Sequence, residues 1–237
     1  MANTAASFTA SVVPEGMALN YTNFTMAELR KNGGLDALNK IYAEKNLMYF
    51  ARTGEGIKYH LYLNKPIDKA DLTGVKLRIA PIYREFFVRL GANVAQIAPG
   101  EVYTALERGV VDGYGWPLIG IFDLGWHDKT KYRVEPGFYA IEQGVVFNLA
   151  SWNKLTAEQR AFLEKQRVWL ESLNAEAAAT DGAAEVKRHE TSGIQVIKLP
   201  PAEAAKLLKV ANEAAWDGIE KASPTHGPKL RAQLAPK

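Results

Sequence analysis

The chain has 237 residues, 47% of them hydrophobic, and a formal net charge of +3, with lysine and arginine spread along its whole length. This composition provides enough apolar surface for one large domain or two small ones, and so small a net charge gives no electrostatic reason to expect nucleic acid as a partner. The sequence contains no apolar run of about 18 residues that would span a membrane, and its lack of cysteine excludes disulfides, thiolate metal ligands and cysteine nucleophiles.

The first 56 residues predict short helices followed by a strand. In order, they give a small polar segment at 1–11, an apolar run at 15–21, a helix at 25–42 interrupted at Gly33 and Gly34, and a strand at 46–52. An edge-like strand at 56–63 and a helical turn at 68–72 follow.

Residues 74–117 alternate short strands with short helices. The strands are expected at 75–79, 94–97 and 110–111, and the helices at 83–90 and 102–108, each helix ending at a glycine. This alternation predicts βαβ units and a parallel sheet. Ligands of such sheets bind beyond the carboxyl ends of the strands. Arg78 and the turn at 112–117 both fall at such ends.

The remainder of the chain predicts two more strands and a long helix, followed by a last strand and helix. They are expected at 131–134, 144–149, 157 to about 190, 193–199 and 201–222. Thr156 and Gln159 have the spacing of a capping box. The long helix would extend roughly 50 Å, too far for one small domain. Its predicted apolar face consists of Phe162, Trp169, Leu173, Ala177 and Ala184; a coiled coil is the alternative, although the heptads are not sustained.

Several separated motifs resemble the solute-binding proteins of TRAP transporters, the DctP-type family that delivers organic acids to a membrane permease. They are GVKLRI at 74–79, LGA at 90–92 and PGEVYTALERGVVDG at 99–113, in the family's order. The resemblance implies a two-lobed α/β fold of the type II periplasmic-binding-protein kind, with the long helix spanning both lobes. Lobe I would contain 1–56 plus about 142–180, and lobe II 57–141 plus about 181–237.

The resemblance also implies location and partners. It predicts a periplasmic protein that is not itself inserted in the membrane, whose partners are a small carboxylate ligand and the permease subunits of a TRAP transporter. No basic residue precedes Arg30, so no signal peptide is recognisable. By comparison with the family, lobe I would be incomplete at its N-terminus.

Arg78 is the main candidate for binding the ligand. From the residues alone, a surface strand charge or a salt bridge to Glu85 or Glu101 is favoured over a ligand contact; the family motif reverses this and favours a contact to the ligand carboxylate. A guanidinium suits this role because its paired N–H donors match both carboxylate oxygens. Lys58 stands where relatives carry a second arginine and would add charge without the planar fork.

Aromatic residues are expected to shape the rest of the pocket. Trp116 stands where many relatives have asparagine, and with Tyr114 it predicts a ligand with an apolar or aromatic body. Tyr83 and Phe138 are further pocket candidates. Glu142 is expected to bond a ligand hydroxyl, to pair with Arg78 in the empty state, or simply to be solvated.

The resemblance also makes Asn3 and Thr4 possible ligand contacts, with helix capping as the alternative. No catalytic, cofactor or metal motif occurs, and the four histidines have no metal-ligand spacing. Two rival functions are an acid/base enzyme using Glu142 and His127, and a ligand-sensing domain of the same fold. His127 and Asp128 are adjacent, and neighbours of this kind are not expected to face one another.

Overall fold

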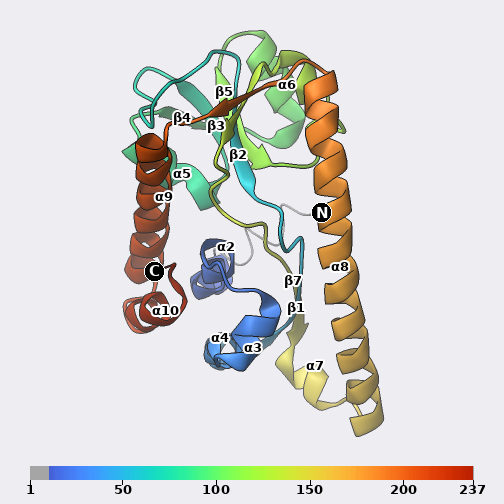
Figure 1. Ribbon diagram of the computed structural model, residues 1–237. Coiled ribbons are helices and arrows are strands. Elements are labelled where there is room, and N and C mark those ends of the chain that lie inside the picture. Colours follow the sequence, from blue (N-terminus) through green and yellow to red (C-terminus); the bar gives the residue numbers. More distant parts are fainter. Residues whose placement is uncertain (1–10, 237) are drawn as a thin grey trace. The chain divides into compact units, whose positions relative to one another are not determined.

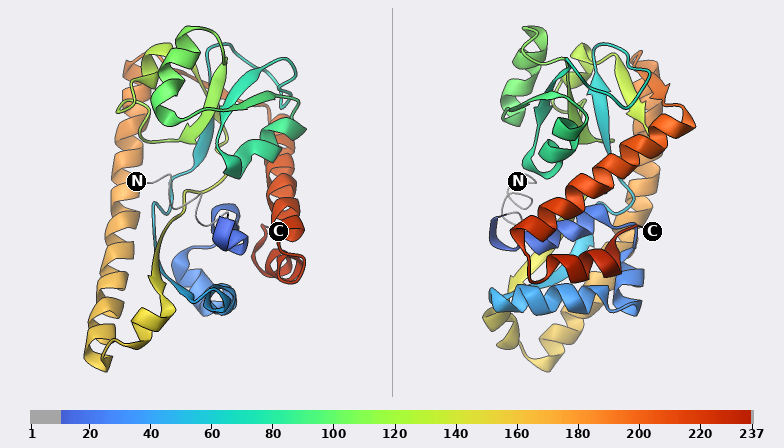
Figure 2. Two further views of the ribbon diagram at one scale, coloured as in Figure 1. Left: turned by 180° about the vertical axis from the view of Figure 1, so that it is seen from behind. Right: turned by 90° about the vertical axis from the view of Figure 1, so that its left-hand side faces the viewer.

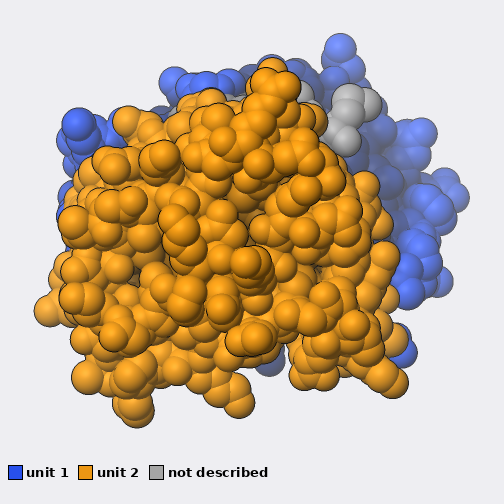
Figure 3. Space-filling model, turned by 90° about the horizontal axis from the view of Figure 1, so that it is seen from above, with its two compact units in different colours: residues 1–56, 140–179, 216–237 blue, residues 57–139, 180–215 orange. Residues whose placement is uncertain are grey.

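The computed structural model describes residues 11–236, which divide into two compact units (Figures 1 and 3). Unit 1 contains the chain up to Gly56, residues 140–179 and the chain from Trp216 onward, and unit 2 contains residues 57–139 and 180–215. The expected division placed 216–237 in the other lobe. These residues join unit 1 because Trp216 is fully buried edge-on against Tyr21 and because α10 (Gly227–Leu234) packs against α4 (Gly34–Glu44).

Unit 1 combines short helices with a two-stranded antiparallel sheet of β1 and β7. Besides α4 and α10, its elements are η1 (Pro14–Met17), α2 (Ala18–Tyr21), α3 (Met26–Lys31), β1 (Leu47–Thr53), β7 (Gln143–Asn148) and α7 (Leu149–Asn153). The predicted interruption of the first long helix is confirmed: α3 ends before Gly33, whose φ of 76° is accessible to glycine at little cost. Thr25 and Glu28 form a capping box at the start of α3.

α8 (Ala157–Thr191) is one uninterrupted helix of 35 residues that contributes to both units (Figures 1 and 2). Its predicted capping box is present, because Thr156 and Gln159 exchange side-chain to backbone hydrogen bonds of 2.9 and 3.1 Å. Its predicted apolar face is wrong. Phe162, Trp169 and Leu173 are 61%, 58% and 46% exposed. The face that packs in unit 1 carries Leu163 and Leu170 instead.

Those two leucines belong to a cluster in which aromatic rings hold α8 and α7 against the sheet. Its buried members are Phe50, Ala51 and Trp152, and partly buried Met48, Val145, Phe147, Leu155, Leu163 and Leu170 pack around them. The register of the helix therefore places the larger side chains, which hydropathy alone would bury, on the outer face.

Unit 2 is built on a six-stranded sheet in the order β4-β3-β5-β2-β6-β8. The strands are β2 (Tyr59–Leu63), β3 (Lys76–Ile79), β4 (Asn93–Gln96), β5 (Gly113–Pro117), β6 (Tyr132–Glu135) and β8 (Gln195–Lys198). β3 is parallel to β4 and β5, and β6 is parallel to β8, whereas β2 is antiparallel to both its neighbours. The start of β2 therefore shares an edge of the sheet with the carboxyl ends of all the other strands.

Helices pack beside this sheet in unit 2. They are η2 (Pro81–Tyr83), α5 (Arg84–Arg89), α6 (Pro99–Glu107), η3 (Trp126–Lys129), the later part of α8 and the first part of α9 (Pro201–Ala222). The predicted strands β3 and β4 and helices α5 and α6 are confirmed, and Gly91 and Gly109 after the helices have φ of 90° and 67°. One buried cluster joins α6 and η3 to Tyr62 and Tyr114 of the sheet.

Three sequence predictions in unit 2 are wrong. The strand expected at 110–111 is β5, which begins at Gly113; Val110 is 53% exposed because the chain turns there before entering the sheet. β2 is an interior strand and not an edge strand, since β5 and β6 flank it. Residues 68–72 form no helix; they contain a bend at 68–70.

Gly113 explains how β5 enters the sheet. A Cβ at this position would lie 2.1 Å from the backbone oxygen of Tyr62. Only glycine therefore allows β5 to approach β2 here. Within the described residues, no helix has the length and apolar character needed to cross a membrane.

Candidate functional site

The sheet of unit 2 brings the main candidates to one edge. Arg78, near the end of β3, pairs with Ala95 of β4 and Tyr114 of β5. Trp116, near the end of β5, lies opposite His60 of β2. Lys58 comes just before β2, and its backbone oxygen accepts a hydrogen bond of 2.9 Å from Leu118. This is the edge at which ligands bind in open α/β sheets.

Arg78 lies within unit 2 and does not extend into solvent, since only 3% of its surface is exposed. Its Nε donates to the backbone oxygen of Ile97 at 3.0 Å, and its Nη1 donates to the hydroxyl of Tyr83 at 3.1 Å. The guanidinium carbon lies 5.3 Å from the ring centroid of Trp116 and 5.7 Å from that of Trp126. Both distances are in the range of cation–π attraction.

All these partners of Arg78 are neutral. Among residues 11–236, no acidic side chain forms an ion pair with it, and Glu85, one of the partners that the sequence left open, pairs with Arg89 at 3.1 Å. A buried charge without a counter-charge is costly, so buried charges in proteins are normally paired. Within the described residues, the contacts of the Arg78 guanidinium are thus limited to neutral hydrogen-bond acceptors and aromatic rings.

Trp126 is a neighbour of Arg78 that the sequence analysis missed. It begins η3, directly after Gly125 with φ of 70°, and is 1% exposed. Its ring stands edge-on to those of Trp116 and Tyr114, with centroids 4.7 and 4.8 Å apart. No local sequence pattern shows that η3 packs beside β5, so the sequence gives no signal for this contact.

Tyr83 and Tyr114 are both 1% exposed, and hydrogen bonds of their hydroxyl groups connect them to Arg78 and, through Thr130, to Trp126. The hydroxyl of Tyr83 donates to the backbone oxygen of Gly115 at 2.6 Å while accepting from Arg78. The hydroxyl of Tyr114 lies 2.7 Å from that of Thr130, which donates to the backbone oxygen of Trp126. Burial raises the pKa of both phenols, so both hydroxyls stay protonated.

Phe138 is 9% exposed and lies in an aromatic cluster. Its ring contacts those of Tyr59, Tyr83, Phe86, Phe87 and Tyr139 at centroid distances of 5.0 to 6.1 Å. Phe138 therefore packs against the ring of Tyr83 and helps to hold that ring in place. Lys58, in contrast, is an exposed residue just before β2.

Glu142 belongs to unit 1, where it is 7% exposed and accepts a 2.7 Å hydrogen bond from the hydroxyl of Tyr49. Burial raises the pKa of Glu142, although this hydrogen bond and nearby Arg52 act in the opposite direction. It is therefore not the solvated charge that the sequence allowed. Asn3 and Thr4 lie outside the described residues.

His127 has partners of its own in unit 2. Contrary to the expectation for adjacent residues, its Nε2 lies 3.2 Å from Asp128, and its ring lies 4.4 Å from that of Phe122. Among the described residues, no group of three or more histidine or acidic side chains is placed to hold a metal ion.

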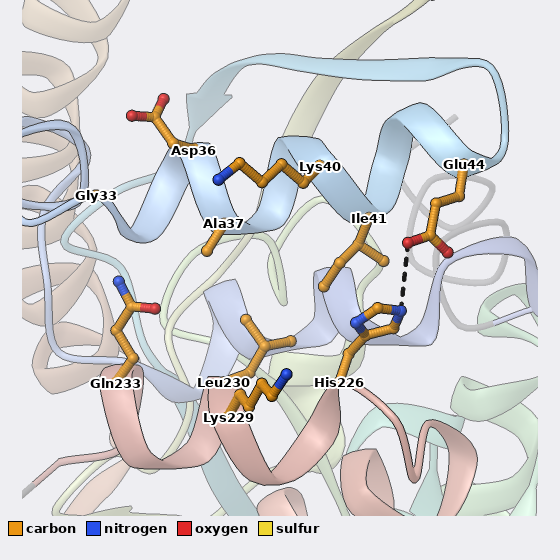
Figure 4. A pocket seen from close by; sticks show the side chains of 10 residues that line it. All are labelled: Gly33, Asp36, Ala37, Lys40, Ile41, Glu44, His226, Lys229, Leu230 and Gln233. Atoms are coloured by element: carbon orange, nitrogen blue, oxygen red, sulfur yellow. Dashed lines mark ion pairs between the residues drawn. The ribbon is translucent and has the colours of Figure 1, made fainter.

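Unit 1 has a separate groove between α4 and α10, with a volume of about 590 Å³ (Figure 4). Ala37, Ile41 and Leu230 line its floor, and an ion pair of 3.4 Å between His226 and Glu44 closes one end. Charges of both signs, Asp36, Lys40 and Lys229, surround it. With Glu44, the lining has two acidic and two basic side chains, so with a neutral His226 it carries no formal excess of positive charge.

The comparisons with known proteins agree with this architecture. Residues 20–221 match the family model of the bacterial extracellular solute-binding proteins, family 7 (DctP), and the chain belongs to this family. A monocarboxylate 2-oxoacid-binding periplasmic protein of Nostoc is 34% identical over 60% of this chain and 40% of its own length. The chain thus spans less than half of this curated relative.

Solved structures show the same fold. A TRAP periplasmic solute-binding protein of Desulfovibrio salexigens with bound orotic acid has a TM-score of 0.82 at 24% identity, covering 96% of this chain and 76% of that one. Another from Rhodoferax ferrireducens with bound malonate has a TM-score of 0.78 at 18% identity, covering 97% and 75%. The expected two-lobed α/β fold with a long helix is confirmed.

Proposed function

We propose that this protein is an extracytoplasmic solute-binding protein that captures a small organic acid in the periplasm and passes it to the permease subunits of a TRAP transporter. The single observation that carries the proposal is the environment of Arg78, a nearly fully buried cation whose described partners are all neutral. A ligand carboxylate would supply the missing counter-charge.

The guanidinium is suited to this role. Of its five N–H donors, one is used by Ile97 and one by Tyr83, which leaves donors for both oxygens of a carboxylate. Removing one partner of a buried charge pair costs about 2–5 kcal/mol, or roughly 30- to 4,000-fold in affinity. An interaction of this size is enough to make the carboxylate the principal recognition element.

The body of the ligand is proposed to be apolar or aromatic. Both Trp116 and Trp126 lie beside the guanidinium, and the partly exposed indole of Trp116 favours contact with flat or hydrocarbon groups over hydroxyl-rich ones. The orotic acid bound to the Desulfovibrio protein is an acid with a flat ring and no polyhydroxylated chain. Exposed Lys58 would add a weaker, longer-range attraction for the anion.

No bond would be made or broken in this process. The acid/base enzyme is less well supported, because Glu142 bonds to Tyr49 and His127 pairs with Asp128, so each has a local partner. The family to which the chain belongs is also described as solute-binding. We therefore propose binding alone, without cofactor or metal.

Isothermal titration with a panel of acids tests the proposal. The panel would contain 4-methyl-2-oxopentanoate, orotate, benzoate and galacturonate, with leucinol as a ligand that lacks a carboxylate. We expect at least one of the apolar acids to bind in the micromolar range or better, and leucinol not to bind. Arg78→Ala should lower the affinity for that acid at least thirtyfold. Unchanged affinity in Arg78→Ala would remove Arg78 as the carboxylate contact.

A further inference from the structure

The hydroxyl of Tyr83 links two groups that belong to different elements. It accepts a hydrogen bond from Nη1 of Arg78 on β3 and donates one to the backbone oxygen of Gly115 on β5, at 3.1 and 2.6 Å. The oxygen therefore uses its acceptor and donor capacities at once. Within the described residues it is the side-chain group that fixes where Nη1 of Arg78 lies.

The ring of Tyr83 is held independently of this hydroxyl. It contacts the rings of Tyr59, Phe87 and Phe138 at centroid distances of 5.5, 5.5 and 5.9 Å. A phenylalanine at this position would keep all three contacts. The hydroxyl is thus not needed for packing, and burying it has a desolvation cost that its two hydrogen bonds must offset.

Gly115 makes the arrangement possible. A Cβ at this position would lie 2.8 Å and 3.0 Å from Cε2 and Cζ of the Tyr83 ring, and the first of these distances is shorter than Cβ contacts in proteins, so the ring would have to shift. The missing side chain lets the phenol approach the backbone of β5. The same strand then continues to Trp116, which faces the guanidinium at 5.3 Å.

We infer that Tyr83 is a positioning residue, whose hydroxyl fixes the guanidinium of Arg78 so that its free N–H donors are aimed at the ligand carboxylate. Ile97 fixes Nε, Tyr83 fixes Nη1, and the two indoles restrict the plane of the group. A donor fixed before binding loses less conformational entropy on binding. The inference rests on the proposed carboxylate-binding function and assigns Tyr83 a role distinct from touching the ligand.

The test compares two variants that each remove one buried hydroxyl from unit 2. Tyr83→Phe removes both bonds described above. Tyr139→Phe is the matched control, because the hydroxyl of Tyr139 also donates to a backbone oxygen, that of Ala211, at 2.7 Å. Both variants keep their rings, so a similar small loss of thermal stability is expected from each.

Two measurements distinguish positioning from general stability. The first is the affinity for 4-methyl-2-oxopentanoate by calorimetry, expected to fall about tenfold in Tyr83→Phe, the size of one hydrogen bond to a charged group, and less than twofold in Tyr139→Phe. The second is nitrogen NMR of the ligand-free protein, which follows rotation about the Nε–Cζ bond of Arg78. This rotation should be faster in Tyr83→Phe than in the wild type and unchanged in Tyr139→Phe.

Equal losses of affinity in the two variants would overturn the positioning role, as would unchanged affinity together with unchanged rotation in Tyr83→Phe. If the wild type binds no acid of the panel, the proposed function fails. The rotation measurement then decides on the positioning of Arg78 by itself, since it requires no ligand.

Discussion

Two arginines in the sheet of unit 2 have the same exposure and opposite surroundings. Arg78 on β3 and Arg133 on β6 are each 3% exposed. Arg133 donates to the carboxylate of Glu135 at 3.0 Å and to Nδ1 of His189 at 2.8 Å, whereas the described partners of Arg78 are all neutral. Burial alone therefore does not indicate function; among the described residues, the two arginines differ in whether an internal counter-charge is present, and this difference underlies the ligand-binding role proposed for Arg78.

The largest effect should come from removing the charge of Arg78 while keeping its length. Arg78→Met is expected to lower the affinity for an apolar carboxylate by about 2–5 kcal/mol, and to leave the free energy of unfolding unchanged or higher, because a buried charge with no acidic partner is lost. Calorimetric titration and urea denaturation measure the two quantities. A large loss of stability with retained affinity would reverse the comparison between the two arginines.

The surroundings of Arg133 should make stability depend on pH. His189 is completely buried, and burial together with Arg133, His60 and Arg188 lowers its pKa from 6.5 to about 4. The unfolded chain therefore takes up this proton first as the pH falls. The contribution of neutral, buried His189 to the free energy of unfolding is fully present above about pH 6.5. It is lost progressively as the pH falls from about 6.5 to about 4, and the total loss is about 3 kcal/mol.

Urea denaturation at pH 7 and pH 4.5 would measure this loss, and His189→Gln provides the control, because a glutamine cannot titrate. The decrease in unfolding free energy should be smaller in the variant than in the wild type. Equal decreases in both proteins would show that His189 is not the group responsible. Burial also lowers the pKa of His60, which adds a component that both proteins share.

Arg133→Met is the counterpart of the first variant. This change leaves Glu135 without the guanidinium of Arg133. Because the Glu135 side chain is 32% exposed, water can solvate its carboxylate, and the expected loss of stability is only about 1–3 kcal/mol. Affinity for the carboxylate should remain within twofold of the wild type. A tenfold loss of affinity would place Arg133 in ligand recognition and remove the distinction drawn here.

Trp116→Asn should change selectivity more than overall affinity. Replacing the indole with an amide removes apolar contact, so apolar acids are expected to lose about 1 kcal/mol more binding free energy than a hydroxylated acid such as galacturonate. Titrating both ligands against both proteins gives the difference. Equal losses for the two acids would contradict the proposed preference for an apolar body.

The smallest effect is expected at Lys58. Because this residue is exposed just before β2, Lys58→Ala should reduce affinity less than threefold at physiological ionic strength, with a larger effect at low salt. Titrations at two salt concentrations measure the dependence. A salt-independent loss greater than tenfold would show a direct contact to the carboxylate.

The sequence predicted the parts of the fold that depend on local signals. Gly91 and Gly109 ended helices, Thr156 and Gln159 formed a capping box, and alternating apolar residues marked β3. β5 was predicted too early in the chain because Gly113 and Gly115 are poor strand residues by propensity. Glycine is required at these two positions by close contacts with Tyr62 and Tyr83, which are distant in the sequence.

For the candidate site, the sequence singled out Arg78, but the motif and not its local pattern separated it from an ordinary surface charge. The neutrality of its partners, the contribution of Trp126 and the double hydrogen bond of Tyr83 all depend on residues from β5, η3 and the segment after β4. The spacing of residues along the sequence does not predict these contacts between separate elements.

The close approach of β2 and β5 at Gly113 restricts which substitutions this position can tolerate. Its neighbour at 2.1 Å is a main-chain oxygen, which cannot rotate away as a side chain would, so even a methyl group would separate β2 from β5. Gly100 and Gly218, with no atom within 4 Å of the added carbon, meet no such obstacle. In a library of all single substitutions, codon 113 should thus be intolerant, while alanine survives at codons 100 and 218.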